Sequence, residues 1–411
     1  MRFRRFFYKT AFLATFFTLS TGLLHPAALA ANEVYTVRGI PVDATANSVI
    51  EAKKNALSQG YEKAFRALVR KLVPEHDHAK VPKLNSKDAL NYVLDISLSA
   101  ERSSSVRYIA NMTVRFKESQ TRALLRNSGA AIAETVSKPV LILPIEKRAG
   151  SSLLWEDRNQ WRTAWGGVGA SNGLVPLTMP LGDLDDLSLV DAKGALAGNE
   201  GLWKLARKYG SSDVFLSVAE ITNDGAAANL SAVRVGRFGE GRRYQLNVTK
   251  AEGETTQKML RRAARSLDNS LQHDWKQANL LQFGVERWIQ VEVPIAGLQD
   301  WVLVNNRLQG VPAINKVKTR SINRTQVNLD VYFAGDERQL SLALAQKDLA
   351  LVLNERSIWE LQILNRPKAQ QGLNLPAQTN SQVLATEETV VDEVIVPEQE
   401  IDLGSETETV E

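Results

Sequence analysis

The chain has 411 residues, contains no cysteine, and carries 50 basic and 46 acidic side chains. The lack of cysteine excludes disulfides, thiolate nucleophiles, thiolate metal sites and the lipid attachment point of a bacterial lipoprotein. The length suffices for two or three domains, and their stability must come from packed cores alone.

Residues 1–30 have the layout of an export signal. The basic start is followed by an apolar stretch over 11–24 that is too short to span a bilayer, and Ala28-Leu29-Ala30 is a cleavage pattern of small residues. We therefore expect a mature chain that begins near Ala31, lies in the periplasm and has no transmembrane segment. Removing the signal takes away four basic residues and leaves 46 residues of each sign.

The remaining charge is distributed unevenly. No basic residue follows Lys368, whereas ten acidic residues lie between Glu387 and Glu411, so residues 31–368 are net +10 and the rest is net −10. A basic body can indicate nucleic-acid binding, but the basic residues are scattered and an exported protein rarely meets nucleic acid. We predict no nucleic-acid partner and a disordered acidic tail over 367–411.

Hydrophobic periodicity predicts an α/β (α+β) protein built from three small modules in series. The first α/β module covers 31–137. Its expected elements are a strand at 32–40, a long helix with an alanine-rich face that ends at Pro74, a short helix near 89–94, two alternating strands joined by a serine turn, and a helix at 118–126. Residues 127–137 read as a linker.

The middle α/β module covers 138–282 and carries the tryptophan-rich segment. The apolar run 139–144 is typical of a strand covered on both faces. After it we expect a short helix with Trp161 and Trp165, helices at 187–196 and 202–209, a strand at 213–221, a hairpin over 228–250 and a long amphipathic helix from 254 to about 275.

The third module covers 283–366. It reads as strand 286–293, helix 298–308, strands 314–322 and 326–333, helix 337–348, and a closing strand or hairpin over 349–364. This βαββαβ succession is the ferredoxin-like order.

Three patterns with possible chemistry favour structural interpretations. Residues 169–173 match G-x-S-x-G, but the strand before and the helix after the serine are missing, so a glycine turn is favoured. His76-Asp77-His78 has too few ligands for a metal site. The carboxylates of Asp183, Asp185 and Asp186 could bind a divalent cation, but a turn that caps the next helix is favoured. We expect no catalytic set, no metal and no cofactor.

The best candidate for a ligand or partner site lies between Trp155 and Asp186. Trp161 and Trp165 lie four residues apart on one helix face, which favours core packing over an exposed aromatic platform for a glycan or peptide. The candidate residues are Trp155, Glu156, Asp157, Asn159, Trp161, Trp165, Asp183, Asp185 and Asp186.

The chain resembles an uncharacterised family of exported bacterial proteins, domain of unknown function 2066. The resemblance lies in the alanine-rich first helix, the segment 154–165, the residues 180–186, and Tyr332-Phe-Ala-Gly-Asp336 with the leucine-rich helix after it. It covers nearly all of 31–365 and implies no assigned activity. The first two modules also resemble domains of envelope assembly proteins in their succession of elements.

These observations favour a non-enzymatic binding or scaffolding protein of the bacterial envelope that acts through a protein partner. The alternative is an envelope enzyme or glycan-binding module that acts at the Trp155–Asp186 region. Clustering of Trp155, Glu156, Asp157 and Asp183 around an open cleft would favour the alternative, and burial of the tryptophans would favour the first interpretation.

Overall fold

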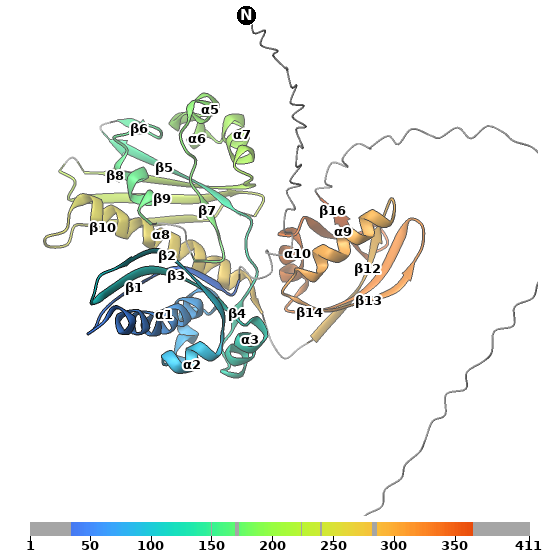
Figure 1. Cartoon of the computed structure of the whole chain (residues 1–411). Helices are drawn as coiled ribbons and strands as arrows, with labels where there is room; N and C mark the ends of the chain where they lie inside the picture. The colour runs from blue at the N-terminus through green and yellow to red at the C-terminus, as the bar shows by residue number, and fades with distance from the viewer. Residues whose placement is uncertain are drawn as a thin grey trace, which may run out of the picture. The chain divides into compact units, whose positions relative to one another are not determined.

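The computed structural model describes residues 34–148, 150–168, 172–222, 224–238, 241–281 and 286–364 (Figure 1). All of them belong to one compact unit, Met1–Asn365. The predicted signal peptide and acidic tail lie outside the described residues. Helices alternate with strands along the chain, and the strands form several small sheets, which confirms the α+β class.

The first module is an antiparallel sheet with a long helix on one face. The sheet has the order β1-β3-β2, and α1 packs against β1 and β3. Ser48 caps the start of α1, because its side chain accepts a hydrogen bond from the Glu51 N–H. The elements are β1 (Thr36–Thr45), α1 (Val49–Leu72), η2 (Glu75–Lys80), α2 (Ser86–Asn91), β2 (Val93–Ser103), β3 (Arg107–Phe116) and α3 (Glu118–Asn127).

Small residues let α1 approach its sheet closely. Ala52, Ala56 and Ala64 are fully buried on the face predicted from the sequence. At Gly60 a Cβ atom would lie 2.8 Å from both the Met112 Cε and the Val42 Cγ1, so no larger residue fits there without a shift. The prediction that an alanine-rich face packs on a sheet is confirmed.

Residues 127–137 are not a linker, contrary to the prediction. Ile132 and Ala133 form strand β4 (Ile132–Ala133), which pairs with β11 (Leu280–Leu281) at the end of the middle module. Both residues are fully buried, as are Glu134 and Thr135 beside them. The buried segment 132–135 is too short to show apolar periodicity in the sequence. Its burial depends on contacts with distant parts of the chain, so the sequence pattern did not reveal it.

The middle module is built on a sheet of order β10-β9-β8-β5-β6, with β7 paired to β5. Strands β5, β7 and β8 are parallel, whereas β8, β9 and β10 form an antiparallel meander. The strands are β5 (Val140–Arg148), β6 (Ser151–Leu153), β7 (Leu177–Thr178), β8 (Asp213–Ile221), β9 (Ala227–Gly236) and β10 (Arg243–Thr249). The buried run predicted at 139–144 is confirmed, since Val140 to Ile145 are all buried.

Helices cover both faces of this sheet (Figure 1). One face carries α4 (Gln160–Gly166) and α8 (Thr256–Ala278), and the other carries α5 (Leu184–Leu189), α6 (Ala192–Ala197) and α7 (Glu200–Lys208). The single helix expected at 187–196 is instead two short helices, because the Asp191 side chain accepts a hydrogen bond from the Gly194 N–H and starts a second helix.

The first two modules share one hydrophobic core. A single cluster of buried apolar residues runs from Tyr35 and the α1 face through Ile132 to Trp161 on α4 and Leu271 on α8. The boundary predicted at 137/138 therefore falls inside a continuous core. A separate cluster fills the space between the sheet and α5–α7, and a third fills the third module.

The third module contains a five-stranded sheet of order β13-β14-β12-β16-β15 with two helices. Its elements are β12 (Glu286–Pro294), α9 (Leu298–Gln309), β13 (Ile314–Ile322), β14 (Gln326–Ala334), α10 (Glu337–Ala345), β15 (Leu349–Leu353) and β16 (Trp359–Ile363). The predicted βαββαβ succession is present as far as β15. The closing element is a hairpin, and its second strand β16 lies parallel beside β12.

Hydrogen bonds connect the third module to the middle one. The Lys138 N–H donates to the Gln346 Oε1 at 2.9 Å, and the Lys138 ammonium forms an ion pair with Asp348. The Gln339 amide donates to the Leu280 carbonyl oxygen at 3.0 Å. None of the described helices combines the length and the apolar composition needed to cross a membrane.

Candidate functional site

Trp161 and Trp165 are core residues. Trp161 is fully buried and Trp165 is 5% exposed, and their rings meet edge to face with centroids 5.8 Å apart. The Trp161 indole N–H donates to the Ser217 carbonyl oxygen on β8 at 3.0 Å. The two side chains join α4 to the sheet and present no aromatic platform.

The polar residues next to them shape the turn that leads into α4. Asn159 is buried and accepts a hydrogen bond from the Arg162 N–H at 2.8 Å, while its amide donates to the Pro144 and Leu153 carbonyl oxygens at 3.0 Å. Glu156 accepts from the Leu154 N–H at 2.8 Å, and Glu156 and Asp157 are exposed. Asn159 thus caps α4 and links it by hydrogen bonds to the backbone near Pro144 and Leu153.

The three aspartates surround the side-chain ammonium of Lys208. The Lys208 ammonium lies 2.8 Å from a carboxylate oxygen of Asp183 and of Asp186, and 3.9 Å from Asp185. Asp183 also caps α5, because its side chain accepts a hydrogen bond from the Asp186 N–H. The capping interpretation is confirmed. Lys208 occupies the place that a bound cation would need.

Asp186 is the buried centre of this cluster. Burial alone would raise the pKa of its carboxyl group, but Lys208, the Tyr209 hydroxyl and the Gly182 N–H outweigh burial and hold this pKa below its usual value. Tyr209 donates to the second carboxylate oxygen at 2.7 Å, and the Gly182 N–H donates at 2.8 Å. Asp186 therefore remains ionised and ties residues 181–186 to α7.

Trp155 packs against the partly buried guanidinium of Arg162. Its indole N–H donates to the Val190 carbonyl oxygen at 2.7 Å, and the Arg162 guanidinium carbon lies 5.4 Å from its ring centre. Arg162 donates to the Pro180 and Leu181 carbonyl oxygens at 2.8 Å. Burial lowers the pKa of Arg162, and the charge of Asp186 opposes that shift. The structure thus brings Trp155 close to the loop that leads to Asp186, whereas Trp161 and Trp165 pack in the core on the other face of the sheet.

The other predicted patterns also have structural roles. Asp77 is buried, pairs with Lys80 at 2.7 Å and accepts from the Ala131 N–H at 2.9 Å. The segment at 76–78 is a turn of 3₁₀ helix rather than a solvated loop. Residues 169–171 of the G-x-S-x-G match lie outside the described residues. Within the described part of the chain, no three His, Asp or Glu side chains are grouped as metal ligands.

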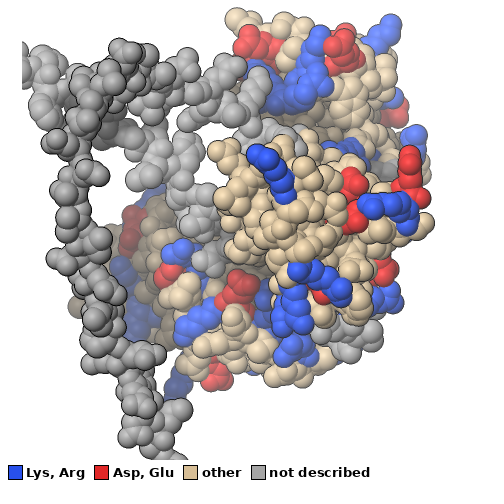
Figure 2. All heavy atoms as spheres, turned by 90° about the vertical axis from the view of Figure 1, so that its right-hand side faces the viewer, with Lys and Arg blue, Asp and Glu red and all other residues tan. Residues whose placement is uncertain are grey.

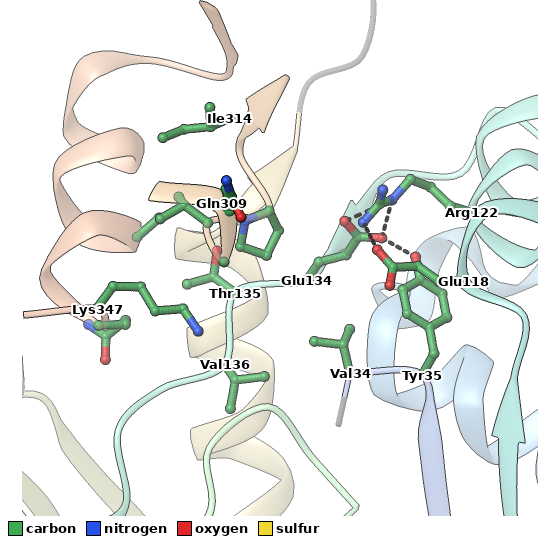
Figure 3. Close-up of a pocket in the computed structure, with 15 residues that line it drawn as sticks. Val34, Tyr35, Glu118, Arg122, Glu134, Thr135, Val136, Gln309, Ile314 and Lys347 are labelled. Atoms are coloured by element: carbon green, nitrogen blue, oxygen red, sulfur yellow. Dashed lines mark hydrogen bonds and ion pairs between the residues drawn. The ribbon is translucent and has the colours of Figure 1, made fainter. Parts of the chain in front are cut away.

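A small pocket beside Tyr35 contains a closed ionic network (Figure 3). The Tyr35 hydroxyl donates to Glu134, and Arg122 donates to both oxygens of Glu134 at 2.8 and 3.1 Å and to Glu118 at 2.9 Å. Burial and the charge of Glu134 raise the pKa of the Tyr35 phenol. Burial alone would lower the pKa of Arg122, but Glu134 raises it.

This network is better suited to holding β4 in place than to chemistry. Both oxygens of Glu134 accept hydrogen bonds, and a phenol whose pKa is raised stays protonated at neutral pH, so it does not act as a base there. Lys347 reaches into the opposite side of the pocket (Figure 3), and burial lowers the pKa of its ammonium. The pocket volume is about 160 Å³, below the roughly 300–1,000 Å³ of ligand sites.

A larger cleft, about 770 Å³, is lined by residues of β10, α8, α10 and β16. Two of its arginines form ion pairs: Arg234 pairs with Asp213 at 2.8 Å and Arg242 pairs with Asp274 at 3.1 Å. The Arg234 guanidinium also lies 5.1 Å from the Trp275 ring centre. The cleft has the volume of a ligand site, but these two arginines are already paired.

The open face of the third-module sheet carries an exposed aromatic pair. Helices α9 and α10 bury the opposite face, where Val291, Leu329 and Val331 form the core. Trp288 on β12 lies opposite Tyr332 on β14, and their rings stack with centroids 6.4 Å apart and an interplanar angle of 29°. Trp288 is 54% exposed. An indole so exposed is the kind of residue that dominates protein interfaces.

Two lysines of the edge strand β13 lie beside Tyr332, on the side away from Trp288. Lys316 lies opposite Tyr332 in the ladder, and the Lys318 ammonium lies 5.2 Å from the Tyr332 ring centre. Within the described chain, neither ammonium forms an ion pair with a carboxylate. By contrast, Arg320 pairs with Asp330 at 2.7 Å. We call Trp288, Tyr332, Lys316 and Lys318 the aromatic–basic face. The side of the molecule on which β13 lies in Figure 1 shows both basic and acidic groups scattered over uncharged surface (Figure 2).

Sequence reasoning missed the aromatic–basic face, although a signal was present. In β12 the apolar residues Ile289, Val291 and Val293 alternate with Trp288, Gln290 and Glu292. Trp288 therefore occupies a position in phase with the polar residues, which predicts an outward-facing indole. The sequence prediction instead favoured the three tryptophans of the middle module, of which Trp161 and Trp165 are buried.

No family model matches the chain, and no curated protein matches it.

Proposed function

We propose that this protein is a non-enzymatic binding protein of the bacterial envelope, exported to the periplasm and similar to the domain of unknown function 2066 family, and that its aromatic–basic face binds an acidic partner protein. The Trp288–Tyr332 stack carries this proposal, together with Lys316 and Lys318 on the neighbouring edge strand, which form no ion pair with a described carboxylate. The signal layout of residues 1–30 supports the compartment.

The chemistry of the face favours a protein partner with carboxylates around an apolar centre. Trp and Tyr supply large apolar area at a small cost in side-chain entropy, and a ring of energetically weaker contacts excludes water around them. Lys316 and Lys318 would attract carboxylates and speed encounter, an effect that salt screens. Most of the predicted site residues between Trp155 and Asp186 are used within the fold, whereas Leu181 and Leu184 in that region are exposed and aliphatic.

Affinity capture from envelope extracts tests the proposal. The baits are the wild-type chain, Trp288→Ala, the double variant Lys316→Gln/Lys318→Gln, and the control Lys147→Gln. Lys147 is also exposed and forms no ion pair with a described residue, but it lies on the middle-module sheet. We expect a partner that the wild type and the control retain, that both face variants lose, and that salt elutes. Equal capture by all four baits would refute the role of the face.

Export is tested separately. The proposal requires that the purified periplasmic protein begin near Ala31, which mass spectrometry of the intact chain measures. A chain that stays in the cytoplasm and still begins at Met1 would refute the proposed compartment.

A further inference from the structure

A further pocket, of about 340 Å³, lies in the first module between α1 and the residues that follow it. One wall is a stripe of α1 from Glu62 to Arg70, where the spacing of the lining residues places them on one helix face. The other wall is formed by residues 78–84, which connect η2 to α2. The volume is at the lower end of the roughly 300–1,000 Å³ of ligand sites, so the pocket fits a small ligand.

The floor of this pocket is apolar and belongs to the packed core. Phe65, Val69 and Val81 are buried, and Pro82 and Leu84 continue the apolar lining toward solvent. An aliphatic chain placed there would exchange water for an apolar surface, which is favourable. The floor therefore selects for a ligand with an apolar body.

Hydrogen bonds at both ends hold the outer wall in place against α1. At one end, the His78 Nε2 lies 3.0 Å from the Val73 carbonyl oxygen, just after the helix. At the other end, the Ser86 hydroxyl donates to the Ser58 carbonyl oxygen on α1. These bonds flank residues 78–84 and fix their position relative to the helix. A cavity built in this way is preformed, as small-molecule sites usually are.

Basic residues outnumber acidic ones in the lining. Arg66, Arg70 and Lys83 line the pocket beside one acidic residue, Glu62. Arg66 pairs with Glu62 at 3.1 Å. Arg70 and Lys83 are exposed, and neither forms an ion pair with a carboxylate of the described ranges. The pocket thus combines an apolar floor with two cationic groups that are available to an anion.

We propose that this pocket binds a small aliphatic carboxylate, such as a fatty acid of medium chain length. The aliphatic chain lies against Val69 and Leu84, and the carboxylate pairs with Arg70 and Lys83. The site shares no residue with the aromatic–basic face and is a binding function beyond the one proposed for that face.

The walls favour an aliphatic acid over the carboxyl end of a peptide, which has the same charged group. A bound peptide needs partners for its backbone amides. The backbone of α1 is hydrogen-bonded within the helix. The Val81 N–H donates to the His78 carbonyl oxygen, and Pro82 has no N–H. These wall residues therefore offer a peptide no backbone donor, whereas an aliphatic chain requires none.

Isothermal titration calorimetry of the purified protein with decanoate tests the proposal. The matched variants are Arg70→Gln/Lys83→Gln and the control Arg126→Gln/Lys87→Gln. Arg126 and Lys87 are also exposed, form no ion pair with a described carboxylate, and lie outside the pocket lining. We expect the pocket variant to bind decanoate about three- to tenfold more weakly than the wild type, as the loss of solvent-exposed ion pairs predicts. The control should bind as the wild type does, and added salt should reduce the difference.

Two further probes separate the two parts of the ligand. Decan-1-ol has the same chain without the charge, so the wild type and the pocket variant should bind it equally. Acetate has the charge without the chain, so it should not bind measurably. All four substituted residues are exposed, and circular dichroism should show that both variants fold as the wild type does.

Each other outcome overturns the inference. The absence of decanoate binding, or equal binding by the wild type and both variants, would show that the pocket is not the site. Tighter binding of the peptide N-acetyl-Leu-Val-Leu than of decanoate, lost in the peptide amide and in the pocket variant, would identify a peptide terminus as the ligand instead. Trp288→Ala should leave decanoate binding unchanged, so the pocket and the aromatic–basic face can each fail without the other.

Discussion

Truncating individual tryptophans separates the buried residues from the exposed one. The three variants are Trp161→Ala, Trp165→Ala and Trp288→Ala, which make the same chemical change at 0%, 5% and 54% exposure. If burial decides the role of each tryptophan, the first two variants act on stability, whereas the third acts on binding.

The expected magnitude follows from the buried area. A fully buried indole removes about 200 Å² from water, which corresponds to about 5 kcal/mol at about 25 cal/mol per Å². Truncation of such a side chain to alanine typically costs about 3–5 kcal/mol. Trp161→Ala also leaves the Ser217 carbonyl oxygen without the indole donor at 3.0 Å, and an unsatisfied buried group adds about 1–3 kcal/mol. We expect Trp161→Ala at the upper end of the range.

Phenylalanine substitutions sharpen the comparison between the two buried residues. Trp161→Phe removes the donor to Ser217, whereas the Trp165 indole nitrogen is buried and has no hydrogen-bond partner among the described residues. Trp165→Phe therefore deletes a polar group that is costly to bury. We expect Trp161→Phe to be more destabilising than Trp165→Phe by about 1 kcal/mol.

Denaturant unfolding followed by circular dichroism measures these differences in the free energy of unfolding. Trp288→Ala should unfold within about 0.5 kcal/mol of the wild type, as surface substitutions usually do, and lose partner capture. Unchanged midpoints for Trp161→Ala and Trp165→Ala would refute the core assignment. A large loss of stability in Trp288→Ala would refute the assignment of Trp288 as a binding residue.

Three further predictions follow from other contacts. Asp186→Asn should lower the free energy of unfolding by about 1–3 kcal/mol at neutral pH, because it removes the charge that Lys208 and Tyr209 stabilise. Since the pKa of Asp186 is lowered in the folded state, this stability is present above the unfolded pKa of about 3.9. It is lost as pH falls through the lower pKa of the folded state. Urea titrations at a series of pH values should therefore give free energies of unfolding for wild type and variant that converge in acid. A difference that stays constant with pH would contradict the assignment. Glu134→Ala should destabilise the fold more than Tyr35→Phe does, because it leaves both the buried phenol and Arg122 without the Glu134 carboxylate. Thermal unfolding measures the two melting temperatures, and the reverse order would be inconsistent with the network. Gly60→Ala should destabilise by about 1–3 kcal/mol through overpacking, since the new methyl group meets Met112 and Val42 at 2.8 Å; a gain in melting temperature, as helix propensity alone would give, would show that the sheet can move away.

The sequence alone determined those features that depend on local pattern. The alanine-rich face of α1, the buried strand β5, the β9–β10 hairpin and the succession of elements in the third module all follow from periodicity within about ten to twenty residues. Side-chain hydrogen bonding to nearby backbone also identified the Asp183 turn as a helix cap. The burial of Trp161 and Trp165 was expected from their spacing on one face of a helix.

Only the tertiary structure decided features that join distant residues. Residues 132–135 are buried because β11 and the Tyr35–Glu134–Arg122 network enclose them from positions far along the chain. Lys208 reaches Asp183 and Asp186 only when α7 packs beside α5, so no local pattern could show that the aspartates already hold a cation. In the same way, Trp288 and Tyr332 lie 44 positions apart in the sequence and become one surface only through the pairing of β12 with β14. Sheet register brings such residues together, because it depends on the packing of the whole module rather than on the residues next to each strand.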